Sequence, residues 1–390
     1  MFAVPLSRRK ALLGLAAALS GPVLAGCDAT LVGQGPSVDA GAPVPVALLL
    51  PGGSGNSGDE VIAQSLKQAA DLAIADLQGV TIDLRVYNTG PDPAGAAAAA
   101  TQAVDEGAKI ILGPVFAEAA NAAGLAVAAR GVNVLSFSNN TEIAGGNVFV
   151  LGATFQNTAN RLVAFAAAQG KSRLFVLRDK NAAGDLGARA IAAAAASARI
   201  SVAGEASYEF SQQGVIAAAP DIAAQIKGAG ADAVFLTADT SGALPLLTQL
   251  LPEAGVDRNA TKFIGLTRWD IPPATLSLPG LQGGWFALPD PGLAQQFEAR
   301  YLAAYGTPPH PIAGLAYDGI AAVGALVRTG NPDALSALSL TQPSGFAGVG
   351  GVFRLLPDGT NQRGLAVATI QNAQVSVIDP APRSFGGAGI

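Results

Sequence analysis

Residues 44–87, VPVALLLPGGSGNSGDEVIAQSLKQAADLAIADLQGVTIDLRVY, decide the fold class. The first seven residues are almost all apolar, which is typical of a strand that is buried on both faces. Residues 59–78 repeat apolar side chains at helical spacing, and residues 80–87 alternate strictly between apolar and polar ones. This alternation indicates a half-exposed strand near the edge of a sheet. The stretch therefore predicts a strand, a helix and a second strand, the unit from which parallel sheets are built.

The same unit recurs along the chain. Before residue 138 we expect two more helices, at 94–106 and 118–129, and two more strands, at 109–112 and 132–137. A second series follows, with helices at 157–169, 184–198, 212–228 and 241–251 and strands at 173–178, 200–204, 233–237 and 262–265. Strands that alternate with helices of this length require parallel sheets with right-handed crossovers. Since a single core rarely grows beyond about 250–300 residues, we predict an α/β fold of two doubly wound lobes.

Charge and composition exclude several classes of function. The net charge is −5 and only 13% of the residues are charged, so we expect no basic surface for nucleic acid. The chain has one cysteine and one histidine, which leaves no disulfide within the chain and no metal site built from such ligands. The histidine, His310, stands among prolines and is expected in a surface loop. We therefore predict no enzymatic activity, no metal and no cofactor.

Two partial catalytic patterns do not change this interpretation. Gly53-x-Gly55-x-x-Gly58 matches a dinucleotide fingerprint, but the acidic residue expected at the end of the second strand is missing. The stretch from Gly52 to Asn56 departs from the nucleophile elbow of serine hydrolases at its last position, and His310 is the only histidine that could serve as a base.

The N-terminal residues indicate export. Three basic residues at positions 8–10 precede a short apolar run, which glycine and proline interrupt before Leu24-Ala25-Gly26-Cys27. Such a run is too short and too broken for a membrane span, which needs about 20 apolar residues. The tetrapeptide resembles the lipobox of bacterial lipoproteins. This resemblance implies a signal peptide at 1–26 and lipid attachment at Cys27.

A protein processed in this way is held on the periplasmic side of a bacterial membrane. Inner and outer membrane both remain open, although Asp28 resembles the residue that retains lipoproteins in the inner membrane of enteric bacteria. Export through the general secretory or the twin-arginine route also remains open. Residues 27–43 are rich in small residues and proline, which predicts a flexible tether between the lipid and the folded body.

Small polar loops follow the predicted strands. In parallel sheets, ligands bind beyond the carboxyl ends of the strands, where backbone N–H groups are free. The loops in those places are residues 51–57, 113–116, 136–141, 179–181, 238–241 and 265–270.

In this order the loops resemble those of the type I periplasmic binding proteins of the leucine/isoleucine/valine-binding group, over about residues 44–378. A late block from Phe297 to Asp318 and a segment from Phe346 to Arg363 also fit that group. The resemblance implies two lobes, a tail and three crossovers between the lobes. The expected ranges are 44–154 with 289–340 for the first lobe, 155–288 with 341–378 for the second, 379–390 for a flexible tail, and 152–155, 287–289 and 338–342 for the crossovers.

Proteins of that group hold a ligand between their lobes and deliver it to an ABC transporter. The resemblance implies that backbone amides and hydroxyls at 115–118 and 138–141 bind a carboxylate, and that Asp270 meets the ammonium of an amino-acid-like ligand. The candidate ligand-binding residues are Ser54, Val115, Phe116, Ser138, Asn139, Asn140, Thr141, Arg268, Trp269 and Asp270.

One departure leaves an alternative open. Residues 181–185, Asn-Ala-Ala-Gly-Asp, lack the aromatic-glycine pair that amino-acid binders often carry after this strand. The chain also resembles the penicillin-binding-protein activator lipoproteins, which use the same fold to contact a peptidoglycan synthase. An open cleft favours solute binding, whereas a cleft plugged by side chains and an exposed apolar patch would favour the regulator.

Overall fold

The structure, a computed structural model, describes residues 35–90 and 92–385. The expected signal peptide, Cys27, Asp28 and residues 386–390 lie outside this part of the chain. Among the described residues, no helix is long and apolar enough to cross a membrane.

The first lobe is built on a parallel five-stranded sheet in the order β2-β1-β3-β4-β5. Its strands are β1 (Val44–Leu50), β2 (Ile82–Asn88), β3 (Ile110–Leu112), β4 (Asn133–Ser136) and β5 (Val148–Val150). The central strands β1 and β3 are nearly continuous apolar runs because helices cover both of their faces. The alternating strand β2 lies at the edge, as its pattern predicts.

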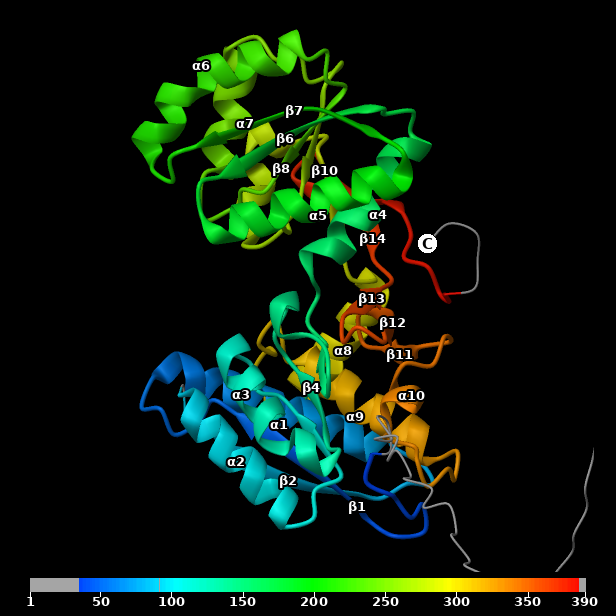
Figure 1. Ribbon diagram of the computed structural model, residues 1–390. Coiled ribbons are helices and arrows are strands. Elements are labelled where there is room, and N and C mark those ends of the chain that lie inside the picture. The colour runs from blue at the N-terminus through cyan, green and yellow to red at the C-terminus, as the bar shows by residue number, and fades with distance from the viewer. Residues whose placement is uncertain (1–34, 91, 386–390) are drawn as a thin grey trace, which may run out of the picture. The chain divides into compact units, whose positions relative to one another are not determined.

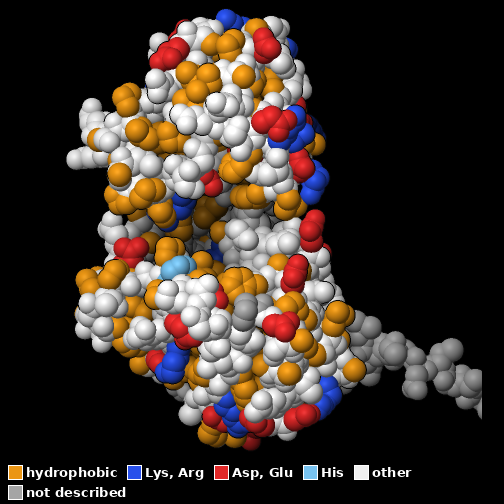
Figure 2. All heavy atoms as spheres, turned by 90° about the vertical axis from the view of Figure 1, so that its left-hand side faces the viewer, with side chains coloured by type: hydrophobic (Ala, Val, Ile, Leu, Met, Phe, Trp, Pro, Cys, Tyr) orange, Lys and Arg blue, Asp and Glu red, His pale blue; other side chains and the backbone are white. Residues whose placement is uncertain are grey.

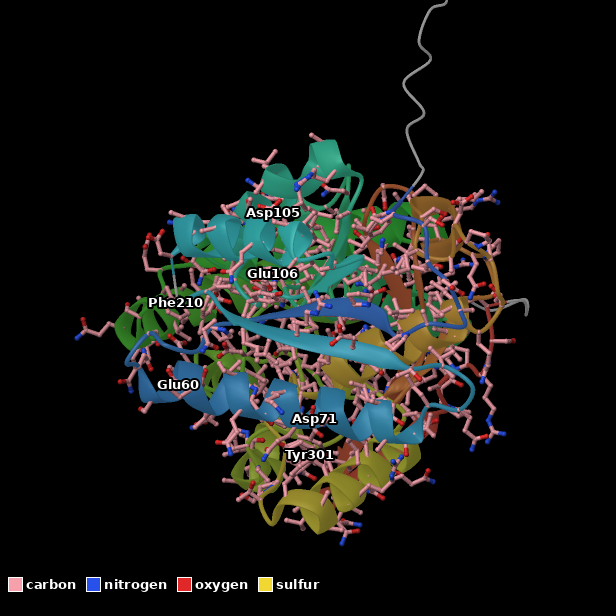
Figure 3. All side chains as sticks on the ribbon, turned by 90° about the horizontal axis from the view of Figure 1, so that it is seen from below. Glu60, Asp71, Asp105, Glu106, Phe210 and Tyr301 are labelled. Carbon is pink, nitrogen blue, oxygen red and sulfur yellow. The ribbon has the colours of Figure 1, made fainter. Side chains whose placement is uncertain are left out.

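Helices cover both faces of this sheet (Figure 1). One face packs on α1 (Ser57–Asp76), α8 (Pro291–Tyr305) and α9 (Gly314–Val327), and the other on α2 (Pro93–Asp105) and α3 (Ala117–Val127). Figure 3 shows Tyr301 of α8 beside α1, where its hydroxyl donates to Gln68 Oε1 at 2.6 Å. A late segment of the chain thus completes the core of the first lobe.

The second lobe contains a seven-stranded sheet in the order β15-β14-β10-β9-β8-β6-β7. Its parallel strands are β6 (Arg173–Asp179), β7 (Ser201–Tyr208), β8 (Ala233–Leu236), β9 (Lys262–Gly265) and β10 (Trp285–Leu288). One face packs on α4 (Phe155–Ala168) and α5 (Ala182–Ala198), and the other on α6 (Gln212–Gly228) and α7 (Leu244–Glu253). The prediction of two doubly wound α/β lobes is therefore confirmed.

An antiparallel pair, β14 (Ala366–Gln371) and β15 (Gln374–Asp379), extends the second sheet at one edge. A small separate sheet precedes it and consists of β11 (Phe346–Gly348), β12 (Gly351–Leu355) and β13 (Asn361–Arg363). The short helix α10 (Ala337–Leu340) leads into this small sheet, whose position the sequence did not predict.

The chain passes from one lobe to the other after β5, after β10 and between β13 and β14. The expectation of a crossover at 338–342 is wrong. Phe346, Phe353 and Leu355 of the small sheet are buried in the same core as α1 and α9. Residues 341–363 therefore belong to the first lobe, because their apolar side chains complete its core.

Both ends of the described chain pack on the body. Val38 is only 7% exposed and its N–H donates to the carbonyl oxygen of Pro332 at 2.9 Å. Ala381 is 8% exposed, and Arg354 lies 4.7 Å from the ring centroid of Phe385. The expected tether and tail therefore include packed residues, at 35–43 and 379–385. Small residues and prolines in these segments misled a prediction based on composition.

Candidate functional site

A cavity of about 700 Å³ lies at the carboxyl ends of both sheets. Residues that follow β3, β4 and β5 line it from the first lobe, and residues that follow β9 and β10 line it from the second. Figure 2 shows the hollow on the surface, with apolar side chains around it. The cavity thus has the position at which parallel sheets bind ligands.

Most of the lining is apolar. Phe297 of α8, Ile312 just before α9 and Leu315 of α9 contribute from the first lobe. Leu288 and Ile271 contribute from the second. Apolar walls with few polar groups are typical of pockets that bury most of a small ligand. Charged groups in this setting therefore decide which ligand can bind.

Arg268 and Asp270 form one charged pair on the cavity wall. Arg268 Nε donates to Asp270 Oδ1 at 2.9 Å, and Arg268 Nη2 donates to Asp270 Oδ2. The carboxylate is only 12% exposed and the guanidinium side chain is 40% exposed. The loop after β9 positions both groups, so the wall offers a cation and an anion next to each other.

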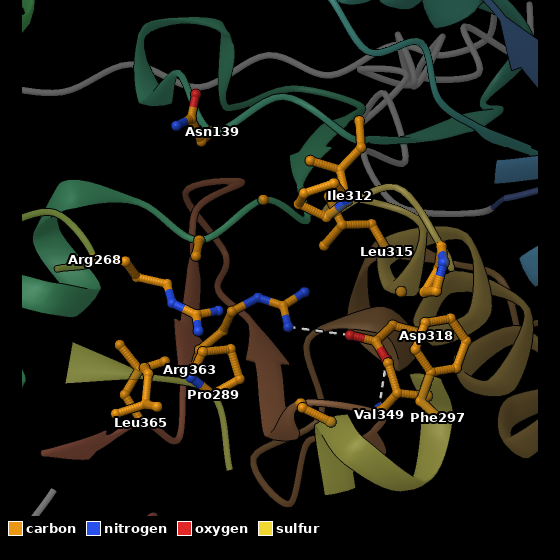
Figure 4. Close-up of a pocket in the computed structure, with 18 of the residues that line it drawn as sticks. Asn139, Arg268, Pro289, Phe297, Ile312, Leu315, Asp318, Val349, Arg363 and Leu365 are labelled. Atoms are coloured by element: carbon orange, nitrogen blue, oxygen red, sulfur yellow. Dashed lines mark hydrogen bonds and ion pairs between the residues drawn. The ribbon is translucent and has the colours of Figure 1, made fainter. Parts of the chain in front are cut away.

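A second pair, Asp318 and Arg363, also lines the cavity (Figure 4) and is more buried than the first. Arg363 Nη1 donates to Asp318 Oδ2 at 3.1 Å, and the Val349 N–H donates to Asp318 Oδ1 at 2.8 Å. Arg363 Nε and Nη2 both donate to the carbonyl oxygen of Leu151, at 2.9 and 2.6 Å. Burial raises the pKa of Asp318, while Arg363 and the Val349 N–H act against that rise.

His310 also lines this cavity. It is half-buried, and its backbone N–H donates to Ser65 Oγ at 2.8 Å. Burial lowers the pKa of its imidazole below the usual value of 6.5. As the surrounding prolines predict, His310 lies in a loop. This loop borders the cavity as well as the solvent.

The structure brings five of the predicted ligand-binding residues together on the cavity wall. These are Val115, Ser138, Asn139, Arg268 and Asp270. Three others are near in sequence but do not line the cavity. Phe116 directly precedes α3 and is 37% exposed. Asn140 caps a short 3₁₀ turn by accepting from the Glu142 N–H, and Thr141 begins that turn.

Ser54 and Trp269 do not line the cavity and have other structural roles. Ser54 Oγ donates to Asp59 Oδ2 at 2.9 Å and belongs to the turn that starts α1. Trp269 is fully buried in the core of the second lobe, between Gly265 and Gly284. Its indole cannot touch a ligand in the cavity, so the prediction for Trp269 is wrong. The two neighbours of Trp269 point to the cavity, and the side chain between them points to the core.

Sequence reasoning missed Asp318, Arg363, His310 and Phe297 as cavity residues. All four stand in the two late segments that carry the family resemblance, 297–318 and 346–363, which was a usable signal. Nothing in the spacing, however, shows that residues 45 positions apart meet at one wall. Among the described residues, no group of three or more His, Cys, Asp or Glu side chains could hold a metal ion.

Residues 43–374 match the family model described as a periplasmic binding protein. The solved structure of a candidate branched-chain amino acid ABC transporter from Rhodospirillum rubrum shares 19% identity with this chain and superposes with a TM-score of 0.74. That match covers 86% of this chain and 100% of the other. No curated protein matches this chain significantly in sequence.

Two further solved structures contain ligands. An ABC transporter substrate-binding protein from Desulfitobacterium hafniense in complex with Leu has 18% identity and a TM-score of 0.63, covering 86% of this chain and 100% of the other. An R. palustris solute-binding protein in complex with benzoate has 19% identity and a TM-score of 0.58, covering 90% and 99%. At such identities the likeness shows the shared fold.

Proposed function

Because the chain belongs to the periplasmic binding protein family, we propose that it binds a small polar, amino-acid-like ligand between its lobes and delivers it to an ABC transporter. The observation that carries this proposal is the cavity of about 700 Å³ at the carboxyl ends of both sheets. Residues of both lobes line it, so a bound ligand contacts both at once. Such contacts would favour closure of the lobes around the ligand.

The charged wall supports an amino-acid-like ligand. In the proposed complex, the ligand's carboxylate binds the Arg268 guanidinium, and its ammonium binds the Asp270 carboxylate. Each new contact is a charge-assisted hydrogen bond, which is stronger than a neutral one. Ser138 and Asn139 add polar groups from the first lobe, and the apolar lining receives the ligand's side chain.

We also propose that the protein is a lipoprotein, held through Cys27 on the periplasmic side of a bacterial membrane. The sequence of the N-terminal segment supports this part of the proposal. A protein tethered at its first mature residue stays near the membrane subunits of a transporter.

The cavity favours solute binding over the role of a penicillin-binding-protein activator. A regulator that acts through protein contacts does not need an open space between its lobes. We infer from the volume and the mixed lining of this space that the protein uses it for a ligand.

Native mass spectrometry tests the proposal. The full chain, purified in detergent, is measured alone and with L-leucine, benzoate and short peptides. We expect a specific adduct with an amino acid, and its loss in Asp270→Asn. The matched control is Asp105→Asn, because Asp105 also pairs with an arginine, Arg130, but lies outside the cavity. Absence of any adduct across the set would contradict solute binding.

A further inference from the structure

A second pocket, of about 400 Å³, lies on the second lobe, at the end of the sheet opposite to the ligand cavity. Arg258, Asn259, Lys262, Phe263 and residues 282–284 line it. Lys262 is the first residue of β9, and Gly284 directly precedes β10. The pocket is therefore at the amino ends of these strands, whereas the ligand cavity is at their carboxyl ends. Nothing in the proposed solute-binding function uses it.

Backbone carbonyls hold the two cations of this pocket in place. Arg258 Nη1 donates to the Pro279 oxygen at 3.0 Å, and Arg258 Nη2 donates to the Gln282 oxygen. Lys262 Nζ donates to the oxygen of Gly283 at 3.0 Å. The two side chains are thus anchored on consecutive residues, 282 and 283, which keeps their charges close together.

Aromatic rings lie against the same two side chains. The Lys262 nitrogen is 5.3 Å from the ring centroid of Trp285, and the Arg258 guanidinium carbon is 5.9 Å from that of Phe263. Cation–π contacts of this kind contribute about 0.5–1 kcal/mol at exposed sites and more where water is excluded. They fix the positions of the cations but do not neutralise their charge.

Among residues 35–90 and 92–385, no acid forms an ion pair with these cations. Neither Arg258 nor Lys262 takes part in an ion pair within the described chain, nor does Lys171, whose Nζ lies 3.4 Å from the Ala260 oxygen. The nearest acid in sequence, Asp257, instead accepts from the N–H of Asn259 at 2.9 Å.

The electrostatics of the pocket reflect this lack of acids. Burial lowers the pKa of Lys262, and the positive charges of Lys171 and Arg258 lower it further. Burial also lowers the pKa of Arg258. Positive charges that are partly removed from water and repel one another raise the free energy of the empty pocket, and a bound anion would relieve that cost.

Hydrogen-bond donors remain free for such an anion. Lys262 has two N–H groups and Arg258 has three that none of the described bonds uses. The side-chain amide of Asn259 at the pocket wall makes no hydrogen bond within the described structure either. A fork of guanidinium donors beside an ammonium matches the oxygens of a phosphate group.

We propose that this pocket binds a phosphate group, with Arg258 and Lys262 as its direct ligands and Lys171 as a further positive charge at its rim. A phosphate carries up to two negative charges and several acceptor oxygens, which suits a site with three cations better than a single carboxylate does. The group can come from free inorganic phosphate or from a phospholipid headgroup, since both present the same oxygens.

Isothermal titration calorimetry on the full chain in detergent tests this proposal at low ionic strength. The probes are inorganic phosphate and glycerophosphoethanolamine, which is the soluble phosphodiester of a lipid headgroup. Tighter binding of inorganic phosphate identifies the free anion as the ligand, and tighter binding of the diester identifies the headgroup. If neither probe binds, the proposal is overturned.

Variants locate the binding. We expect Arg258→Gln and Lys262→Met each to weaken phosphate binding at least tenfold. Arg258→Lys should weaken it less than Arg258→Gln does, because the positive charge remains while the fork of donors is lost. The matched control is Lys227→Met, because Lys227 also donates to a carbonyl, that of Ala254, yet lies outside the pocket. Far-UV circular dichroism checks that each variant is folded. If a neutral variant does not fold, Arg258→Lys still tests the contribution of Arg258. Equal phosphate binding in all folded variants would overturn the assignment.

Discussion

Asp318 and Arg363, 45 residues apart in the sequence, form a buried ion pair at the point where the chain is about to enter the second lobe. Arg363 is the last residue of β13, and β14 of the second sheet begins at Ala366. The same guanidinium donates twice to Leu151, which directly follows β5. One side chain thus links α9 and the end of the first sheet to a strand that leads into the other lobe.

Removing the arginine should destabilise the protein strongly. In Arg363→Met the buried carboxylate of Asp318 loses its cation and keeps only the Val349 N–H, and the carbonyl of Leu151 loses the guanidinium donors. Breaking a buried pair in this way typically costs about 3–5 kcal/mol. Urea denaturation followed by circular dichroism measures this loss.

The double variant Asp318→Asn, Arg363→Met should recover part of the stability, because no unpaired buried charge remains. Arg130→Met provides the control, since its partner Asp105 is exposed and such pairs contribute about 0–1 kcal/mol. A single variant at Arg363 no less stable than the control would show that the buried pair is not needed.

The core position of Trp269 predicts that two glycines cannot be replaced. A Cβ on Gly265 would lie 2.0 Å from the indole nitrogen, and one on Gly284 would lie 2.1 Å from the indole ring. Overpacking of a close-packed core typically costs about 1–3 kcal/mol, so we expect Gly265→Ala and Gly284→Ala to lower the free energy of unfolding by at least that much.

The control for this experiment is Gly228→Ala at the end of α6, where a Cβ would meet nothing within 4 Å. It should be neutral or stabilise the protein by up to about 1 kcal/mol. Thermal unfolding of the three variants gives the comparison. Equal melting temperatures would mean that the indole is free to move, contrary to its burial.

The fold was largely predictable because its signals are local. The apolar run of β1, the helical spacing of α1 and the alternation of β2 each depend on a few neighbouring residues. The site was less predictable than the fold, because the side chains of neighbouring loop residues can point either to the cavity or to the core. Arg268 and Asp270 line the cavity, while Trp269 between them fills the core.

Contacts between residues that are far apart in the sequence could not be predicted from such local patterns. The lobe to which residues 341–363 belong could not be predicted, because the alternation of their apolar side chains fits the core of either lobe. The structure resolves this through Phe353, which is fully buried in the first lobe. The meeting of Asp318 with Arg363 depends on that placement and was missed for the same reason.

The single histidine provides a reporter of the cavity. Burial holds the pKa of His310 below 6.5, so its imidazole stays neutral in the folded protein at pH values where the unfolded chain binds a proton. The stability that this group contributes is therefore present above pH 6.5 and is lost as the pH falls through the folded pKa. Proton NMR of the one imidazole in the chain should give a midpoint below 6.5.

A midpoint at or above 6.5 would contradict the buried position of His310. Ligand binding should move its resonance, because the ring lines the cavity. In His310→Gln, the fall in stability between pH 7.5 and pH 5.0 should be smaller than in the unchanged protein, as measured by urea midpoints at both values.

The pair Arg268 and Asp270 makes the chemistry of the ligand testable. If the ligand is an amino acid, Arg268→Met and Asp270→Asn should each weaken binding at least tenfold, which equals about 1.4 kcal/mol, because each removes the partner of one charged end. If the ligand is a carboxylate without an ammonium group, only the change at Arg268 should weaken binding.

Calorimetric titration of both variants with L-leucine and with benzoate separates these cases. Arg130→Met is the control for loss of a paired arginine outside the cavity and should bind as the unchanged protein does. Stronger binding in Asp270→Asn would arise if the aspartate mainly occupies the guanidinium in the empty site, since its removal frees Arg268 for a carboxylate. That result would argue for an anion, and against an amino acid, as the ligand of this cavity.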